Sequence, residues 1–519
     1  MPFQSEATSL RRLPTIFFAI LLLAPLPWVV AYFLPPLNHD VAGVLQFSER
    51  WLAGERLYRD LIDMNPPLIF MLTLIPAALG KMTPLGGPLA VVLCTFAYLG
   101  MSFVLCWRLL RLGWAATAAI RWMAPSLLLF LLVVCPGQAF AQREHLMLAS
   151  LLPYLMLADL RVRGVPVSTL MCCTVALFAA LGFAIKPHFL IFPVLIEGYV
   201  LLRRGLRPAL ADVVPWAMGA LFVVYALFVL LAMPAYLTFV VPLAQHNYLQ
   251  LGLGPWNVLR HSQLTIPTAL FLPLALLAFI PGASHLSRLV ALAGIGSILQ
   301  AIAQGKGWPY HVLPTETCLL LLGGVLLCDF CERLRPQHVR AWGAGAGTGF
   351  MLLCYLLAVL VRPTFYFRGE FEDGRPAALL AEVQKYAAGQ PVLVLSPGVY
   401  PFFPVLNYAG STMATRFMTM WVLQGAYATC PPGAPRYRSL EEMDAAEAFV
   451  FDAVAQDMDR LRPRLLVVDR YPGIPVCDGR DFNFLDYFRQ HPLFEANWEH
   501  YQYIGNLDGE LFLYLRQAE

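Results

Sequence analysis

Residues 38–68, NHDVAGVLQFSERWLAGERLYRDLIDMNPPL, form a polar interruption between two strongly apolar runs near the start of the chain. The first part of this stretch is amphipathic, because apolar residues lie at helical spacing opposite charged ones: Val44, Leu45, Phe47, Trp51 and Leu52 against Glu49, Arg50, Glu55 and Arg56. Such a pattern predicts a helix that lies along a surface rather than across a membrane. We expect Asp60 and Asp63, further along, on the exposed surface of the loop.

The flanking sequence on both sides is rich in apolar runs of the length that crosses a bilayer, which is about 20 residues. Eleven such runs lie near residues 13–34, 88–107, 122–137, 145–160, 168–185, 188–202, 209–233, 264–281, 288–304, 311–328 and 342–361. Several of these runs are short or contain proline, so the sequence allows ten to thirteen spans. A further apolar run, 67–80, contains Pro76 and is short for a span. We interpret it as an interfacial or re-entrant helix, so that 38–82 forms one outer loop with interfacial helices.

The distribution of arginine supports this count. With eleven spans, the short loops richest in arginine all fall on one side of the membrane, whereas an extra span at 67–80 would reverse every later assignment. Basic loops remain in the cytoplasm, so the N-terminus is expected inside and the C-terminal tail outside. The residues behind this inference are Arg11, Arg12, Arg108, Arg111, Arg121, Arg161, Arg163, Arg203, Arg204, Arg207, Arg288, Arg333, Arg335 and Arg340.

The composition agrees with a membrane protein. Of 519 residues, 59% are hydrophobic and 13% are charged, and the mean hydropathy is +0.62. These values exclude a soluble enzyme, a disordered protein and a nucleic-acid-binding domain. The net charge of +3 conceals two unlike parts, since residues 1–361 carry +9 and residues 362–519 carry −6. We therefore predict a polytopic α-helical membrane domain over 1–361 and a soluble domain over 362–519.

The tail has the pattern of an α/β domain. Residues 391–396 and 464–469 are short apolar runs typical of buried strands, 510–515 suits a last strand, and 440–461 alternates apolar and acidic residues at helical spacing. The tail contains two cysteines, Cys430 and Cys477. They could pair in an oxidising compartment, but spacing alone leaves the bridge open.

The unusual polar residues of the membrane domain collect on the predicted outer side. Five separate outer segments contribute a carboxylate, a cation or an imidazole, among them His39, Asp40, Arg143, Glu144, Lys186, Lys306, His311 and Glu316. Each has a plain structural explanation: a helix cap for Asp40, snorkelling for the lysines, an ion pair for Arg143 with Glu144, and pairing with His311 for Glu316. Their convergence instead favours a site where cations bind a phosphate and a carboxylate acts as a general base.

The order of these elements resembles that of the GT-C fold. An acidic residue after the first span, an amphipathic loop helix, a Pro-Pro-Leu element and a second acidic residue in the next outer loop are similar to bacterial relatives of the protein O-mannosyltransferases and the aminoarabinose-transfer enzymes. The resemblance covers about residues 10–360 in topology, but its motifs lie only within 38–68 and 142–145. Asn65-Pro66-Pro67-Leu68 departs from better-known members, which have Lys or His before the prolines.

The resemblance implies a membrane glycosyltransferase that uses a polyprenyl-phosphate sugar donor. Asp40 would deprotonate an acceptor hydroxyl, and Glu144, commonly Asp in relatives, would be the second acidic site. On charge and topology alone, Arg143, Lys186, Lys306 and His311 are predicted to bind the donor phosphate, with His39 and Glu316 beside the acceptor or second acidic site. No metal-ligand spacing requires a divalent cation, and the sequence leaves one open.

Several alternatives remain on sequence grounds. The acceptor is a glycan, a lipid or a protein, no nucleic acid is expected as a partner, and neither the sugar nor the oligomeric state is specified. A lipid-linked polysaccharide polymerase or ligase would use similar chemistry on the outer face. A lipid flippase or transporter is disfavoured, since it predicts midplane polar groups and two symmetric halves. Short loops and the polar outer tail favour a bacterial inner membrane with a periplasmic tail.

Overall fold

The computed structural model describes residues 20–113, 118–261, 263–333, 336–361, 364–470, 473–477 and 479–517. Arg11, Arg12 and Arg335, which entered the topology prediction, lie outside these ranges, as do the side chains of Arg121 and Arg340. The chain divides into two compact units. We call residues 1–34, 93–226 and 253–365 the helical unit, and residues 35–92, 227–252 and 366–519 the mixed unit.

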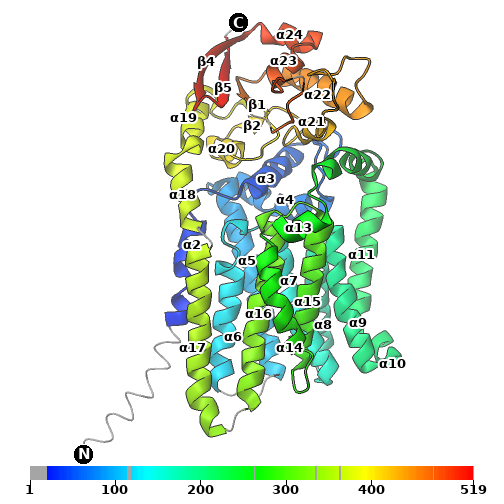
Figure 1. Cartoon of the computed structure of the whole chain (residues 1–519), viewed down its shortest axis with the longest axis vertical. Helices are drawn as coiled ribbons and strands as arrows, with labels where there is room; N and C mark the ends of the chain where they lie inside the picture. The colour runs from blue at the N-terminus through cyan, green and yellow to red at the C-terminus, as the bar shows by residue number, and fades with distance from the viewer. Residues whose placement is uncertain are drawn as a thin grey trace, which may run out of the picture. The chain divides into compact units, whose positions relative to one another are not determined.

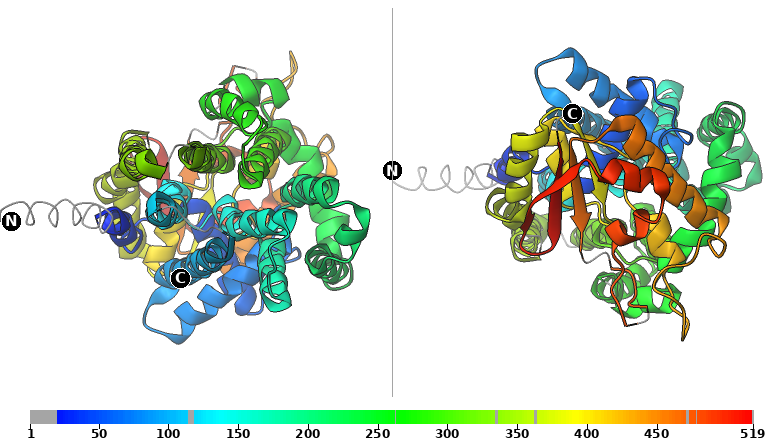
Figure 2. Two further views of the ribbon diagram at one scale, coloured as in Figure 1. Left: turned by 90° about the horizontal axis from the view of Figure 1, so that it is seen from below. Right: turned by 90° about the horizontal axis from the view of Figure 1, so that it is seen from above.

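The helical unit is a bundle in which α15 packs against α16, α7 and α9, and α7 against α8 (Figures 1 and 2). Its elements are α2 (Leu26–Tyr32), most of α5 (Gly86–Gly113), α6 (Ala118–Leu129), η1 (Phe130–Val134), η2 (Gly137–Ala139), α7 (Arg143–Arg163), α8 (Thr169–Phe183), η3 (Pro187–Leu190), α9 (Ile191–Arg204), α10 (Leu206–Leu210), most of α11 (Val213–Ala232), α13 (Pro255–His261), α14 (Thr265–Leu277), α15 (His285–Gln304), α16 (Pro309–Arg333) and α17 (Pro336–Val361).

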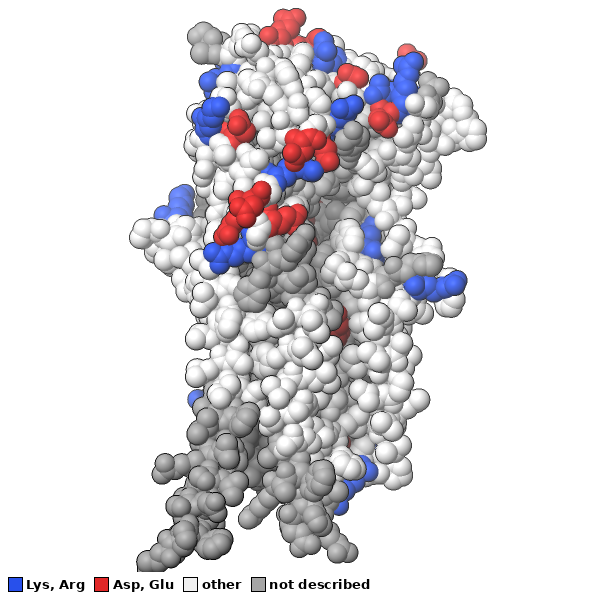
Figure 3. All heavy atoms as spheres, turned by 60° about the vertical axis from the view of Figure 1, so that its left-hand side comes forward, with Lys and Arg blue, Asp and Glu red and all other residues white. Residues whose placement is uncertain are grey.

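Where the structure describes them, the predicted apolar runs overlap helices. Among the residues that the structure describes, five of these helices, α5, α7, α11, α15 and α16, are long and apolar enough to cross a membrane. Five others are shorter apolar helices within α2, α6 to η1, α8, α14 and α17, and the run at 188–202 lies in η3 and α9. On the face drawn in Figure 3, few charged side chains lie over the helices of this unit. The chain is therefore a membrane protein with a predominantly helical fold, as predicted.

A network of partly buried ion pairs connects three helices of the helical unit. The Arg161 guanidinium donates to both carboxylate oxygens of Glu197 at 2.6 and 2.9 Å and to Asp212 Oδ2 at 2.8 Å, and Arg204 also pairs with Asp212. Tyr154 donates to Glu197 at 2.7 Å. These contacts satisfy charges that burial would otherwise penalise. They join the second half of α7 to α9 and to the start of α11. Arg143, at the first residue of α7, lies toward the other end of that helix.

The mixed unit is built on a five-stranded sheet of order β2-β1-β3-β5-β4, in which β2, β1 and β3 are parallel and β5 and β4 run antiparallel to their neighbours. The right-hand view of Figure 2, from above, shows this sheet with its helices. The elements are α3 (His39–Leu52), α4 (Pro67–Met82), η4 (Tyr236–Val240), α12 (Val241–Leu243), η5 (Ala244–Tyr248), η6 (Leu249–Leu251), α18 (Thr364–Asp373), α19 (Arg375–Ala387), β1 (Pro391–Leu395), α20 (Phe402–Ala409), β2 (Thr412–Met413), α21 (Trp421–Ala426), α22 (Ala445–Leu461), β3 (Leu465–Asp469), α23 (Phe484–Phe488), α24 (Pro492–Trp498), β4 (Tyr501–Leu507) and β5 (Leu511–Arg516).

The predicted α/β character of the tail is confirmed, and the three predicted strands are β1, β3 and β5. The predicted helix over 440–461 begins later, at Ala445, where the Asp444 side chain accepts from Ala446 N and Glu447 N. Two strands were not predicted. β2 has only two residues, and β4 lies at the edge of the sheet with exposed residues along its length, so neither forms an apolar run.

The first loop packs within the mixed unit rather than standing alone. Helix α3 contacts α4 and α20, and its buried Gln46 exchanges two hydrogen bonds with the backbone of Ser411 and Met413, at 2.9 and 2.8 Å. Arg50, 5% exposed, donates to the carbonyl oxygens of Met413 and Thr415 at 3.1 and 2.6 Å. The segment predicted as an outer loop is thus joined to the C-terminal residues by buried polar contacts.

The expected surface position of Asp63 is wrong. Asp63 is only 4% exposed, and its carboxylate accepts from the backbone and side-chain nitrogens of Asn65 at 2.8 and 2.7 Å. The carboxylate therefore shapes the turn that leads into Pro66 and Pro67. Asp60 does reach the surface, where it pairs with Arg56 at 2.8 Å.

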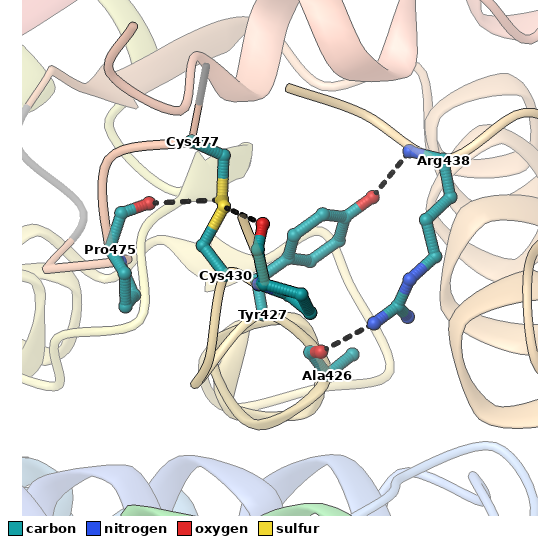
Figure 4. Close-up of a disulfide and its surroundings, with 7 residues drawn as sticks. Ala426, Tyr427, Cys430, Arg438, Pro475 and Cys477 are labelled. Atoms are coloured by element: carbon teal, nitrogen blue, oxygen red, sulfur yellow. Dashed lines mark hydrogen bonds between the residues drawn. A yellow bond between two sulfur atoms is a disulfide. The ribbon is translucent and has the colours of Figure 1, made fainter. Parts of the chain in front are cut away.

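The sequence leaves the pairing of the two tail cysteines open, and the structure shows them paired. Cys430 and Cys477 form a disulfide with their Cα atoms 5.7 Å apart, across a sequence separation of 47 residues (Figure 4). The bridge lies beside Tyr427, whose hydroxyl accepts from the backbone nitrogen of Arg438 at 3.0 Å, while the Arg438 guanidinium donates to Ala426 O at 2.9 Å. The disulfide and these bonds hold together two irregular segments of the mixed unit.

We expect replacement of both Cys430 and Cys477 by Ser to lower the stability of the mixed unit by about 2–4 kcal/mol, because a long loop is released in the unfolded chain. Urea-dependent protease resistance of the full-length protein in detergent would measure the change. Cys94→Ser, at a free cysteine, is the control and should have little effect. Equal resistance of the double variant and the parent would contradict a stabilising bridge.

Candidate active site

The first turn of α7 places an arginine and a glutamate in the interior of the helical unit. Arg143 is 7% exposed and Glu144 is fully buried. The helix has no side-chain cap at Gln142. Instead, the His145 ring accepts from Ala141 N at 3.1 Å and contacts Leu132 O at 2.8 Å, which fixes the turn before the helix. A carboxylate in a first helical turn is also stabilised by the helix dipole.

Lys186 lies in the segment between α8 and α9, and its side chain contacts the first turn of α7. Its Nζ donates to Glu144 Oε1 at 2.6 Å and to Gln304 Oε1, at the end of α15, at 2.8 Å. The lysine is 7% exposed. The ion pair compensates part of the cost of burying both charges, and breaking it from one side would leave the other charge without its counter-ion.

A chain of amide hydrogen bonds continues from Lys186 to α16. Gln304 Nε2 donates to Gln300 Oε1 at 2.6 Å, and Gln300 Nε2 donates to the backbone oxygen of His311 at 2.9 Å. The two glutamines are one helical turn apart on α15, so they share a face. The helix ends at Gly305, which adopts a left-handed conformation with φ of +68°.

Aromatic rings of the α15–α16 connection cover the cations. The Tyr310 ring centre lies 5.5 Å from Arg143 Cζ and 5.3 Å from Lys186 Nζ, within the range of cation–π attraction. The same ring packs edge-on against His311 at 4.4 Å between ring centres, and Trp308 lies 5.5 Å from His311. Tyr310 thus connects two cations and an imidazole in one cluster.

Lys306 adds a third cation from the loop before α16. It is 5% exposed, and burial lowers the pKa of its amine to about 8. Lys306 lies four residues before Tyr310, the ring that contacts both Arg143 and Lys186. Three basic side chains and one carboxylate therefore meet at one end of the helical unit. We name Arg143, Glu144, Lys186, Lys306, His311 and Tyr310 the cation cluster.

The structure thus brings together Arg143, Glu144, Lys186, Lys306 and His311, five of the eight residues singled out from the sequence. Glu316 lies further along α16, on the same helix as His311. The residues that sequence reasoning missed are Gln300, Gln304 and Tyr310. Two amides spaced i, i+4 in the apolar second half of α15 were the signal that could have indicated the glutamine pair.

His39 and Asp40 belong to the mixed unit, at the start of α3. The helix is capped by Asn38, whose side chain accepts from Asp40 N at 3.0 Å and Val41 N at 3.3 Å. Asp40 is therefore not the cap, and its carboxylate lies 3.8 Å from His39 Nε2 with 17% of the side chain exposed. The His39 ring packs 5.9 Å from Tyr400, in the segment after β1. An accessible carboxylate beside an imidazole is suited to taking up a proton.

Within the described ranges, no three His, Cys, Asp or Glu side chains converge as metal ligands do. The cation cluster contains three basic side chains and one carboxylate, so it retains a net positive charge.

The solved structures that match the chain include two that align over nearly its full length. ArnT from Cupriavidus metallidurans bound to undecaprenyl phosphate aligns with a TM-score of 0.53 and 13% identity, covering 97% of this chain and 98% of that one. The apo state of the same protein gives the same score and identity, with 98% of each chain covered. No protein-family model and no curated protein sequence matches. At 13% identity these two likenesses show the fold of the chain, which is GT-C-like.

Proposed function

We propose that the protein is a membrane glycosyltransferase that moves a sugar from a polyprenyl-phosphate donor to an acceptor hydroxyl on the outer face of the membrane. The observation that carries the proposal is that two buried cations, Arg143 and Lys186, both lie over the Tyr310 ring, which packs against His311, with the buried Lys306 four residues before Tyr310. Such a cluster suits a phosphate monoester or diester at the edge of an apolar helical body. The likeness to ArnT with bound undecaprenyl phosphate supports a lipid phosphate as the ligand.

In the proposed reaction, Asp40 takes the proton of the acceptor hydroxyl, and the acceptor oxygen forms a bond to the anomeric carbon of the donor sugar. The bond between that carbon and the phosphate oxygen breaks, and its electron pair leaves with the polyprenyl phosphate. Negative charge grows on the departing phosphate, where Arg143, Lys186 and Lys306 would stabilise it. Glu144 orients Lys186, while His39 and Glu316 remain candidates for the acceptor or second acidic site.

The proposal includes the predicted topology of about eleven spans, with 1–361 as the membrane body and 362–519 outside the cytoplasm. The Cys430–Cys477 disulfide supports this orientation, since such bridges persist in oxidising compartments such as the bacterial periplasm. The Arg-rich helix ends of α7, α9 and α16 would then face the cytoplasm. A bacterial inner membrane fits both features.

The decisive experiment is an assay of the purified protein with a panel of radiolabelled polyprenyl-phosphate sugars. Release or transfer of label supports a glycosyltransferase, and formation of long chains on a lipid carrier indicates the polymerase or ligase alternative. Movement of the lipid across vesicles without bond cleavage would point to a flippase and contradict the proposal. The panel would also identify the sugar and whether the acceptor is a lipid, a glycan or a protein.

Binding of undecaprenyl phosphate is expected to weaken as the pH rises from 7 to 9. Lys306 has a pKa of about 8, so it changes there from mostly charged to mostly neutral, and the site loses one positive charge. A hydrogen bond to a charged group contributes about 1.5–3 kcal/mol, so we expect a loss of about tenfold or more. Dissociation constants at pH 7, 8 and 9 would measure it.

The matched variant is Lys306→Gln, which should bind more weakly at pH 7 and lose most of the pH dependence. Lys385→Gln, in the mixed unit, is the control and should behave as the parent protein. If Lys306→Gln retained the full decrease between pH 7 and 9, the titrating group would lie elsewhere.

A further inference from the structure

The glutamine pair on α15 forms an ordered chain between two fixed ends. At one end Lys186 Nζ can only donate a hydrogen bond, and at the other the backbone oxygen of His311 can only accept one. Between them Gln304 turns its Oε1 to the lysine and its Nε2 to Gln300, and Gln300 turns its Nε2 to the carbonyl. Either amide would lose its bonds by flipping, so the orientation of each is set by the other.

Because Gln304 is uncharged, it can hold the Lys186 ammonium group without neutralising its positive charge. A lysine side chain is flexible and needs anchors to hold its ammonium group in one place. Glu144 supplies one anchor but offsets much of the positive charge. Gln304 supplies a second at 2.8 Å without further neutralisation. A carboxylate at position 304 would hold the ammonium equally well and would repel a phosphate.

We propose that Gln304, itself oriented by Gln300, is a positioning residue that holds Lys186 for an anionic phosphate ligand. This inference rests on the proposed function, because it takes Lys186 as a phosphate-binding group. The chain also reaches the first turn of α16, where His311 and Tyr310 of the cation cluster lie. The glutamines thus connect Lys186 to the first turn of α16.

The test measures undecaprenyl phosphate binding by the full-length protein in detergent micelles. Gln304→Met removes both hydrogen bonds and should weaken binding about tenfold. Gln304→Glu keeps an acceptor for Lys186 but adds a negative charge, and should weaken binding further. If Gln304 only stabilised the fold, Gln304→Met and Gln304→Glu should weaken binding to a similar extent, since both variants break the hydrogen bond to Gln300. Ser297→Ala is the control: it breaks another α15–α16 contact, Ser297 to Thr315 at 2.9 Å, and should leave binding unchanged.

Gln300→Met provides a second route if Gln304 variants are poorly folded. It should weaken binding by about threefold, and the double variant Gln304→Met/Gln300→Met should bind no more weakly than Gln304→Met alone, because the two residues act in series. Unchanged binding in both single variants, with binding lost in Lys186→Met, would overturn the positioning role but keep the phosphate site. Unchanged binding in Lys186→Met would overturn the phosphate site itself.

Discussion

Replacement of Asp40 by Asn should reduce sugar transfer by about 10²–10⁴-fold while leaving undecaprenyl phosphate binding within twofold of the parent value. A positioned general base contributes rate enhancement of this order, and an amide cannot take up the acceptor proton. The fold should tolerate the change, since Asn38 and not Asp40 caps α3, and a carboxylate in a first helical turn contributes only about 0.3–1 kcal/mol. Turnover of a radiolabelled donor measures the loss.

The matched control is Asp60→Asn in the same loop. Asp60 forms an exposed ion pair with Arg56, and such pairs contribute about 0–1 kcal/mol, so transfer should be nearly normal. Near-normal turnover by Asp40→Asn would exclude it as the base.

The parts of the fold that could be predicted depend on local composition. Apolar runs located the helices of the membrane body, and short apolar runs located β1, β3 and β5, because burial on both faces leaves a continuous apolar sequence. Edge strand β4 lacks such a run. Contacts between distant residues were beyond reach: nothing near Arg50 indicates that it donates to Thr415, 365 positions away.

In the candidate site too, the placement of residues could be predicted from the sequence, but their contacts could not. Arginine topology predicted that Arg143, Lys186 and Lys306 would reach one surface, because the positive-inside rule relates residues far apart in the chain. It did not predict that Lys186 would form an ion pair with Glu144. Nor did it predict that Gln304 would accept a second hydrogen bond from the same ammonium group. A buried amide in a helix has the same sequence appearance whether it bonds to a lysine, a carbonyl or a neighbouring helix.

The Lys186–Glu144 pair allows stability and function to be separated. Lys186→Met should cost about 3–5 kcal/mol of stability, because it leaves the fully buried Glu144 carboxylate without its counter-ion. It should also reduce undecaprenyl phosphate binding by about 100-fold, in the range for loss of one partner from a buried charge contact. Taken alone, this variant could not distinguish an unfolded site from a site that lacks its cation.

The double variant Lys186→Met/Glu144→Gln makes that distinction. Removing both charges eliminates the uncompensated carboxylate, so thermal stability should return to near the parent value, as is common when a buried ion pair is replaced as a whole. Binding and transfer should remain low, because the phosphate has still lost the ammonium group. Recovery of binding together with stability would mean that Lys186 serves only to neutralise Glu144. The cations that stabilise the leaving group would then have to be Arg143 and Lys306 alone.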